Sequence, residues 1–435
     1  MKQIDTIALA QNLIRQKSVN PPGNEYLVAK VVTSFLDDHG IPYRSIEKTN
    51  GRPNIIARVA GRGEAPPLLL YGHMDVVDAS EAGWKNEPFS GIIEDGFLWG
   101  RGALDMKGGL AMMLSAFATF SITSPPPGDI ILAIVSDEEA GGHDGAGFLV
   151  DNHASYFTEV KHALSEFGGF SLNVGGQRFL PVQVAEKRTT TITVTFDGTG
   201  GHSALYAEKE VIGHAMNFIL RLQSSKRAIN IDPVAKEMIT QMADALGSKG
   251  LLLKLLLNPI IAPAILRLYG KKLASIFEPL IRTTVQVTGI STPNTTSNVI
   301  PSSVTVRLNA RLLPSENGDE FISWLRQITG PKAEIKSDIP VIGPEGYDNT
   351  QFRLIKDITA TLDPDITVIP MLLPGSTDAR HFARIGIQTY GFLPMILPER
   401  FSFLPLVHGV NERIPVSVLT QGANSLTSFI RKYYG

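Results

Sequence analysis

The sequence predicts an α/β protein in which one mixed domain is interrupted by a smaller α+β domain. Three observations support this prediction. The chain has 435 residues, more than one ordinary hydrophobic core accommodates. Helix and strand patterns alternate in both terminal parts, and the strands there are nearly continuously apolar. Between residues 187 and 341 the strands instead alternate polar and β-branched side chains, as strands with one solvent-exposed face do.

The first domain is predicted to be discontinuous and to comprise residues 1–186 and 342–435. Its predicted elements before the interruption are a helix at 27–39, strands at 54–61 and 66–77, a helix at 108–120, and strands within 129–142 and 162–169. This alternation indicates a largely parallel sheet with helices on its faces. The same pattern returns after residue 342 and ends in a helix near the C-terminus.

The second domain, residues 187–341, has the order strand–helix–strand–strand–helix–strand when an apolar insertion around 230–285 is left out. That order is typical of a ferredoxin-like open-faced sandwich. The most apolar part of the insertion, 250–273, is interrupted by Lys254 and two prolines, and it never reaches the roughly 20 apolar residues of a membrane span. We expect a buried or interface helix pair there. Contact with lipid or with an apolar substrate is the less favoured alternative.

Composition limits the function classes. The formal net charge of -2 gives no long-range attraction to nucleic acid or to an anionic membrane. The N-terminus lacks the apolar core of a signal peptide, so we expect a cytoplasmic protein that acts on a small molecule. The chain has no cysteine, which excludes disulfides and thiolate metal ligands. Any metal site must therefore consist of His, Asp and Glu side chains.

Imidazole and carboxylate side chains follow the buried strands of the first domain. They are His73, Asp75, Asp105, Glu138, Glu139 and Glu166, with Asp105 in a glycine-rich turn before a helix. Ligands bind at the carboxyl ends of strands in open α/β sheets, so we expect these residues to meet at one edge. Carboxylates crowded in a cleft need compensating cations. Histidine with carboxylates and no cysteine suits zinc.

Adjacent positions within these motifs predict different roles. His73 and Asp75 lie on the same side of an extended chain, so Asp75 can accept a hydrogen bond from the imidazole and orient it. Glu138 and Glu139 point in different directions, so one can bind metal while the other acts as a base. Each residue alone has a structural explanation; Asp105, for example, could cap its helix. Together they do not, because buried strand ends are a poor place for solvated charges.

Eight segments in order along nearly the whole chain resemble motifs of the M20 family of zinc metallopeptidases and aminoacylases. They are YGHMDVV, WGRGALDMKGG, SDEEAGG, SEFGG, GTGGHS, NVIP followed by RLLP, GSTDAR and VHGVNERIP. The resemblance implies a zinc-peptidase-like α/β catalytic domain with an inserted lid or dimerisation domain. It also implies two Zn²⁺ per chain, for which Co²⁺ or Mn²⁺ can substitute.

The resemblance assigns the metal ligands residue by residue. Asp105 is similar to the carboxylate that bridges the two ions. His73 and Glu166 would complete one site, and Glu139 and His408 the other. A rival ligand by proximity is His143, which lies close to Glu139 in the sequence; His408 is favoured because its segment fits the last family motif.

The resemblance also assigns catalytic and substrate-binding roles. Glu138 is similar to the general base, and Asp75 to the residue that orients the metal-binding histidine. His202 resembles the histidine that stabilises the oxyanion from the partner subunit in dimeric members. The residues similar to those that hold the substrate's carboxylate are Asn298, Arg311 and Arg380. Arg311 could instead be an exposed strand arginine, and Arg380 a structural partner of Asp378.

The function these features predict is hydrolysis of an amide next to a free carboxylate, in N-acyl amino acids or short peptides. A strict carboxypeptidase or dipeptidase is the alternative within the same chemistry. A non-catalytic binding protein on the same fold is the alternative from another class, and such a protein should have lost a ligand or the base. None is lost here. A histidine supplied by a partner would require a homodimer, which the inserted domain could form.

Overall fold

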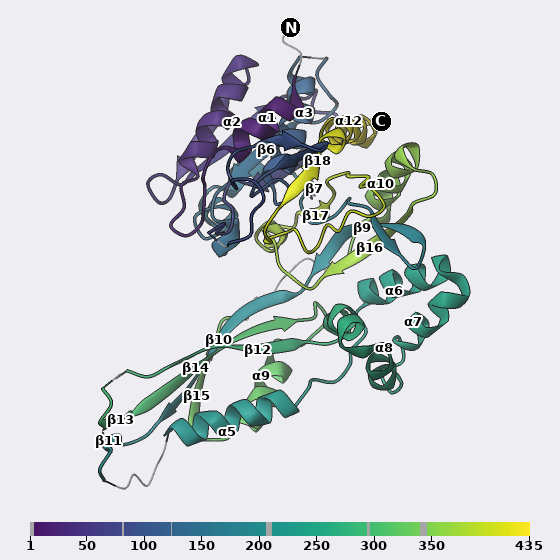
Figure 1. Ribbon diagram of the computed structural model, residues 1–435. Helices are drawn as coiled ribbons and strands as arrows, with labels where there is room; N and C mark the ends of the chain where they lie inside the picture. The colour runs from purple at the N-terminus through teal and green to yellow at the C-terminus, as the bar shows by residue number, and fades with distance from the viewer. Residues whose placement is uncertain (1–3, 81, 123, 206–210, 294–295, 340–345) are drawn as a thin grey trace.

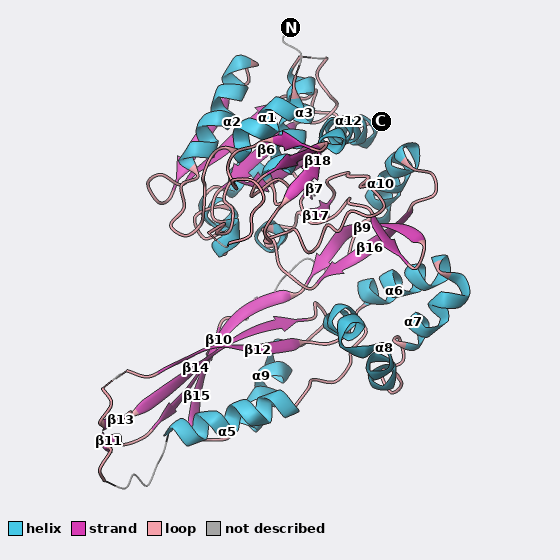
Figure 2. Cartoon of the chain, in the orientation of Figure 1, coloured by secondary structure: helices cyan, strands magenta, loops and turns pink. Residues whose placement is uncertain are grey.

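The structure is a computed structural model that describes the chain except for residues 1–3, 81, 123, 206–210, 294–295 and 340–345 (Figure 1). Two separate sheets with their own helices make up most of it (Figure 2). The predicted junction between residues 341 and 342 lies outside the described residues. The division of the chain into 1–186 with 342–435 and 187–341 therefore stays a prediction.

The large sheet is mixed and has nine strands. In spatial order these are β1 (Tyr43–Glu47), β2 (Pro53–Val59), β6 (Ile130–Val135), β3 (Leu68–His73), β7 (His162–Ser165), β17 (Gln388–Gly391), β9 (Gln177–Glu186) and β16 (Thr367–Leu373), with β8 (Leu172–Val174) paired to β9. Strands β6, β3, β7 and β17 run parallel to one another. The predicted α/β class with a largely parallel centre is confirmed.

The parallel register brings the predicted polar residues to one edge. His73 lies opposite Val135, so the chain leaves β3 and β6 at the same level. Every residue of β3 and β6 is buried, because helices cover both faces of a central parallel sheet. Strand β7 ends at Ser165, one residue before Glu166. The carboxyl ends of three neighbouring strands therefore meet there.

Helices pack on both faces of this sheet. They are α1 (Thr6–Ile14), α2 (Tyr26–Asp38), α3 (Lys107–Ser121), α4 (Ala146–Asn152), α10 (Asn349–Leu362), α11 (Ala379–Ala383) and α12 (Val416–Tyr433), with 3-10 turns η1 (Glu138–Ala140) and η2 (Ala154–Phe157). Helix α3 is buried on nearly all sides because α1 and α12 cover it. A small sheet of β18 (Arg413–Pro415), β5 (Phe97–Trp99) and β4 (Ile93–Glu94) lies beside them.

The second sheet is antiparallel and has the order β12 (Thr284–Ser291), β14 (Ser303–Leu312), β10 (Arg188–Asp197) and β15 (Ala333–Ser337). Helices α5 (Val211–Ser224) and α9 (Gly318–Thr329) share a hydrophobic core with it. Buried and accessible residues alternate along β14, as predicted for a strand with one wet face. This is the strand order of the predicted open-faced sandwich. At its far end β11 (Gly201–His202) pairs with β13 (Val299–Ile300) (Figure 1).

The apolar insertion forms α6 (Pro233–Ala245), η3 (Gly247–Gly250), α7 (Leu251–Leu255), α8 (Ala262–Phe277) and η4 (Glu278–Leu280). Helix α6 packs on β16 and β9, and the buried side chains of the insertion join the core of the large sheet. The insertion therefore packs against the large sheet. Within the described residues, no helix combines the length and apolarity needed to cross a bilayer.

Candidate active site

His73, the last residue of β3, faces two carboxylates. Its Nε2 lies 3.1 Å from Asp105 Oδ1 and 3.2 Å from Glu166 Oε2. Its Nδ1 donates to the backbone carbonyl of Asp75 at 3.0 Å and lies 3.5 Å from the Asp75 carboxylate. A carbonyl only accepts, so the proton sits on Nδ1 and the lone pair of Nε2 points at Asp105 and Glu166. This is the tautomer that a metal-binding histidine needs.

The side chain of Asp75 has a second task that the sequence did not suggest. Its carboxylate accepts the backbone N–H groups of Glu138 at 3.2 Å and Glu139 at 3.1 Å, and the amide of Asn20 at 2.8 Å. Burial would raise the pKa of Asp75, but hydrogen bonds, first that with His73, hold it below its ordinary value. Asp75 thus positions both the histidine and the turn that carries the two glutamates.

Asp105 lies between two imidazoles. Its Oδ1 faces His73, and its Oδ2 lies 3.1 Å from His408 Nε2. His408 Nε2 also lies 3.2 Å from Glu139 Oε2. Two groups can converge on a metal, with ligand atoms within 4.8 Å: His73, Asp105 and Glu139, and His73, Glu138 and Glu166. Asp105 thus offers one carboxylate oxygen toward His73 and the other toward His408, as a ligand that bridges two metal ions must.

The pKa values of the clustered side chains are those expected where carboxylates surround a cation site. Burial, together with neighbouring charges, raises the pKa of Glu166 to about 8 and that of Glu138 well above its ordinary value. Hydrogen bonds to Asp105 and Glu139 raise the pKa of His408 to about 10. The buried Glu139 Oε1 has no hydrogen-bond partner within the described part of the chain. The cluster therefore favours a bound positive charge, and its imidazole and carboxylate groups are ligands that divalent cations prefer.

A buried ion pair joins the two loops that carry Asp105 and His408. Glu412 accepts the backbone N–H groups of Leu104 at 2.7 Å and Asp105 at 3.1 Å, and Arg101 donates to it at 2.9 Å. Arg101 also donates to the carbonyl of His408 at 3.2 Å. Sequence reasoning missed this pair, although both residues stand inside the quoted motifs WGRGALDMKGG and VHGVNERIP. The sequence feature that could have indicated this pair is a charged residue, Arg101, inside a glycine-rich turn next to buried strands.

A second supporting network lies behind Asp75. Asn20 donates to both Asp75 and Asp137, the latter at 3.1 Å. Asp137 has a left-handed backbone (φ 71°) just before Glu138 and pairs with Arg52 at 2.9 Å. Arg52 also pairs with Glu25. No sequence pattern pointed to Asn20, because its role arises only when distant segments meet.

Two arginines line the same cavity as the cluster. The cavity, of about 250 Å³, is bounded by Asp105, Glu138, Glu139, Glu166 and His408 on one side and by Arg311 and Arg380 on another. Arg311 comes from β14 of the second sheet, and its Nη1 donates to the Pro374 carbonyl at 3.2 Å. Burial and the charge of Arg380 lower the pKa of Arg311. Among the described residues Arg380 forms no ion pair with Asp378, and it donates to Ser376 at 2.7 Å.

The remaining predicted residues lie elsewhere. His202 and Asn298 are exposed neighbours at the β11–β13 end of the second sheet, where the Ser203 N–H donates to the Asn298 carbonyl (Figure 1). Neither lines the cavity within this chain. His143 is exposed, and among the described residues its ring forms no ion pair with Glu139, whereas His408 Nε2 lies 3.2 Å from Glu139 Oε2.

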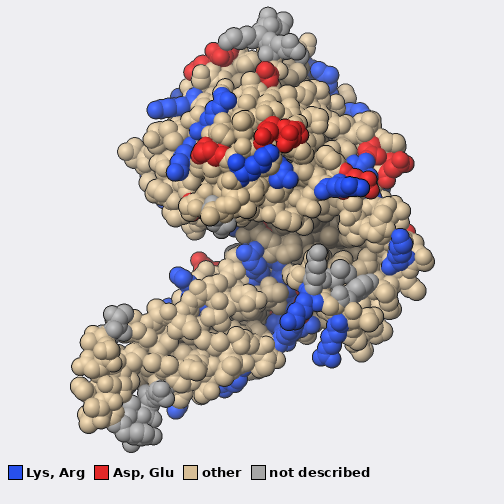
Figure 3. Space-filling view, viewed as in Figure 1, with Lys and Arg blue, Asp and Glu red and all other residues tan. Residues whose placement is uncertain are grey.

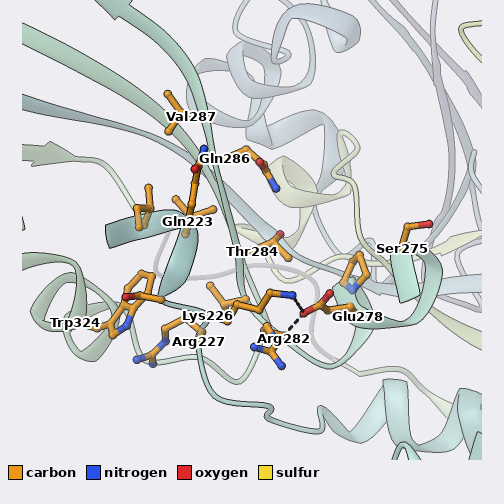
Figure 4. A pocket seen from close by; sticks show the side chains of 15 residues that line it. Gln223, Lys226, Arg227, Ser275, Glu278, Arg282, Thr284, Gln286, Val287 and Trp324 are labelled. Carbon is orange, nitrogen blue, oxygen red and sulfur yellow. Dashed lines mark hydrogen bonds and ion pairs between the residues drawn. The ribbon is translucent and has the colours of Figure 1, made fainter. Parts of the chain in front are cut away.

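A larger cavity of about 500 Å³ lies between the end of α5, η4 and β12 (Figure 4). Its three cations are already paired: Lys226 and Arg282 contact Glu278, at 2.8 and 3.4 Å, and Arg227 contacts Glu316. No group of converging ligands is found there among the described residues. The smaller cavity is therefore the candidate active site.

A cavity lined by histidines, carboxylates and arginines at the edge of a parallel sheet is characteristic of a metal-dependent hydrolase. Comparison with known proteins identifies the family. The model described as peptidase family M20/M25/M40 matches residues 69–432. The chain belongs to this family, the M20 resemblance is confirmed, and the protein is an amide-bond hydrolase of a metal-dependent family.

Individual relatives agree with this assignment. The chain is 30% identical to succinyl-diaminopimelate desuccinylase of Cereibacter sphaeroides, over 95% of each chain. Its fold is similar to that of an M20 family metallo-carboxypeptidase from Sulfolobus solfataricus, with a TM-score of 0.71, 18% identity and 99% of each chain covered. It is also similar in fold to a Bacillus subtilis protein described as a dinuclear metal-binding peptidase, with a TM-score of 0.62, 14% identity, and 99% and 97% of the chains covered.

Proposed function

We propose that the protein is a dinuclear zinc hydrolase that cleaves an amide next to a free carboxylate in N-acyl amino acids or short peptides. The observation that carries the proposal is the shared cavity, in which Arg311 and Arg380 lie beside the metal-binding cluster. Guanidinium groups bind a carboxylate through paired hydrogen bonds. A substrate held in this way presents the adjoining amide to the cluster.

The residues fit two ions. Asp105 would bridge them, His73 and Glu166 would complete one site, and Glu139 and His408 the other. Zinc suits the imidazole and carboxylate ligands, and Co²⁺ or Mn²⁺ would substitute for it. When bound, the metals supply Lewis-acid polarisation of the carbonyl and a lower pKa of water.

Glu138 is the proposed general base. Its buried carboxyl has a pKa well above the ordinary value, so it can hold a proton between two steps. It takes the proton from the attacking water and delivers it to the leaving amine. Asp75 fixes the turn that carries it, at 3.2 Å from the Glu138 N–H.

We assign oxyanion stabilisation to His202 of a second copy of the chain. His202 is exposed at the far end of the second sheet, so it can serve another molecule. The outer face of α5 supports pairing there, because Ile212, Met216 and Leu220 are 41%, 58% and 61% exposed and recur every four residues. A homodimer through this region would give the inserted domain its predicted lid or dimerisation role, with Asn298 near His202.

A substrate panel tests the proposal. Acetyl-, long-acyl- and peptidyl-amino acids are compared with the same compounds amidated at the carboxylate, with Zn²⁺, Co²⁺ or Mn²⁺ added. Turnover of N-acyl amino acids that is lost on amidation supports the proposal, and turnover of peptides alone favours the strict carboxypeptidase or dipeptidase. Equal turnover of the amidated compounds would refute the role of the arginines. A non-catalytic binder is disfavoured because all proposed ligands and Glu138 are present.

A further inference from the structure

The helices of the insertion carry apolar side chains on the side that packs against the protein and also on the side that faces solvent. Their inner side packs into the core of the large sheet through residues such as Leu253, Leu256 and Ile265. Their outer side also carries large apolar side chains, although it faces solvent: Leu251 65%, Leu252 40%, Ile260 89%, Ile261 39%, Leu268 71% and Ile276 52% exposed. A surface helix of a globular protein normally has one polar face. Clustered apolar exposure of this kind marks an interaction surface.

The turn between α7 and α8 is the most exposed part of this surface. Residues 258–261 are all exposed, and Ile260 is the most exposed large apolar residue of the described chain. The hydrogen bond from the Ile260 N–H to the Asn258 side chain, at 3.0 Å, fixes the turn. Ile260 at the tip of this turn therefore presents its apolar side chain to any partner that binds the α7–α8 end of the molecule.

The charges around the apolar side chains identify the kind of partner. Residues 246–277 contain no Asp or Glu and five basic residues in the sequence. Those whose side chains the structure describes are Lys249, Lys254, Arg267 and Lys271, and Lys254 pairs with Asp244 at 2.6 Å. Around α8 the visible charged side chains are blue rather than red, among tan apolar and polar ones (Figure 3). Arg267 and Lys271 are exposed, and neither forms an ion pair with another described residue. The net charge of -2 for the whole chain conceals this local excess of positive charge.

We infer that this surface, residues 246–277, docks on an anionic lipid bilayer, with the α7–α8 turn inserted among the head groups. Apolar side chains flanked by Lys and Arg are what an interfacial helix pair presents to such a membrane. A second copy of the chain fits less well, because a two-fold contact through this surface would bring like charges together. The helices lie on the membrane rather than across it, and the inference is independent of the substrate proposed above.

Vesicle sedimentation of the full chain tests this inference. The vesicles are phosphatidylcholine alone or with roughly 30 mol % phosphatidylserine, which supplies the anionic surface. We expect binding to the anionic vesicles only. Ile260→Asp should weaken the partition at least roughly tenfold, because burial of one isoleucine is lost. Arg267→Gln with Lys271→Gln should weaken it roughly 30-fold, since each surface cation contributes about fivefold.

Matched controls separate docking from folding. Ile122→Asp alters another exposed isoleucine, 44% accessible, and Arg44→Gln with Arg353→Gln removes two exposed cations elsewhere. Both controls should bind like the wild type. Absence of wild-type binding, or equal binding of all variants, would overturn the inference. So would sedimentation velocity showing that Ile260→Asp dissociates a dimer, which would make the surface a contact between copies.

Discussion

The strand-end cluster and the β11–β13 end of the second sheet both carry histidines expected to act in one reaction, but only the first is assembled. His73 is buried, with two carboxylates within 3.2 Å. His202 is exposed, and its ring accepts a local hydrogen bond from the Ala204 N–H at 3.1 Å. Parallel strands collect the residues at their ends within one chain, whereas the end of the second sheet leaves His202 at the surface, where we propose that it serves a second copy of the chain.

The two regions also differ in how firmly they are held. Asp75 and Glu412 together accept five backbone N–H groups around the cluster. Positioned groups of this kind preserve the site's geometry before substrate arrives. At the β11–β13 end, the described residues form a two-residue ladder and a few further backbone hydrogen bonds, such as that from Ser203 to Asn298. Substitutions in the cluster should therefore abolish chemistry within each chain, and those at the far end should act between chains.

The largest effect is expected within the cluster. Glu138→Gln should lower kcat roughly 10²–10⁴-fold, because it removes proton transfer while keeping the shape of the side chain. Metal content, measured by elemental analysis, should stay at the wild-type level. Glu320→Gln, on the exposed surface of α9, is the matched control and should change neither quantity. Wild-type turnover by the Glu138 variant would remove it from the mechanism.

Next in size is the effect at the far end of the second sheet. His202→Ala should lower kcat roughly 10²-fold through loss of oxyanion stabilisation. Its melting temperature should not change, because the side chain is exposed. His143→Ala, an exposed histidine close to Glu139 in the sequence, should retain activity within about twofold. If His143→Ala lost metal and His202→Ala kept full activity, the assignment of the two histidines would be wrong.

The arginines line the cavity beside the cluster and are proposed to bind substrate, so their loss should have an intermediate effect. Arg311→Ala should lower kcat/KM roughly 30-fold, since a hydrogen bond to a charged group is lost. The loss should appear for substrates with a free carboxylate and vanish for amidated ones. Arg307→Ala, on the same strand but exposed, should behave as wild type. An equal loss on both kinds of substrate would indicate a structural role for Arg311.

The smallest effect is expected from the network behind the cluster. Asn20→Ala removes one donor from Asp75 and should weaken metal binding roughly tenfold, measured by competition with a chelating dye. The exposed Asn50→Ala is the control. Unchanged metal affinity in Asn20→Ala would show that the backbone N–H groups alone hold Asp75.

Much of the first region was predictable from the sequence. Apolar strands followed by His73, Asp105 and Glu166 indicated one sheet edge, because the end of a parallel strand fixes where the next residues go. The strand order of the second sheet followed from the predicted order of its helices and strands, and its solvent-exposed face from the alternating pattern. The predicted hydrogen bond from His73 to the Asp75 carboxylate is longer, at 3.5 Å, than the bond to its carbonyl, because the carboxylate is occupied by the turn that carries Glu138.

The remaining features of the site could not be predicted from the sequence, because they depend on contacts between distant segments. Asn20 and Glu412 act through partners 55 and 311 residues away, and no local periodicity predicts such pairs. The sequence did not predict that α6 packs on β16 and β9 of the large sheet, because no local pattern specifies which distant strands an apolar helix covers. In the proposed dimer, the position of His202 relative to the cluster would depend on a second chain.

Mixing two inactive variants tests the central claim that the two regions work together across a subunit contact. Glu138→Gln and His202→Ala chains are unfolded together, refolded in equal amounts and assayed on an N-acyl amino acid. Random pairing places one complete site in about half of the dimers, so we expect about a quarter of wild-type activity. Activity no higher than that of the separate variants, in a sample where tagged mixed dimers are recovered, would contradict it.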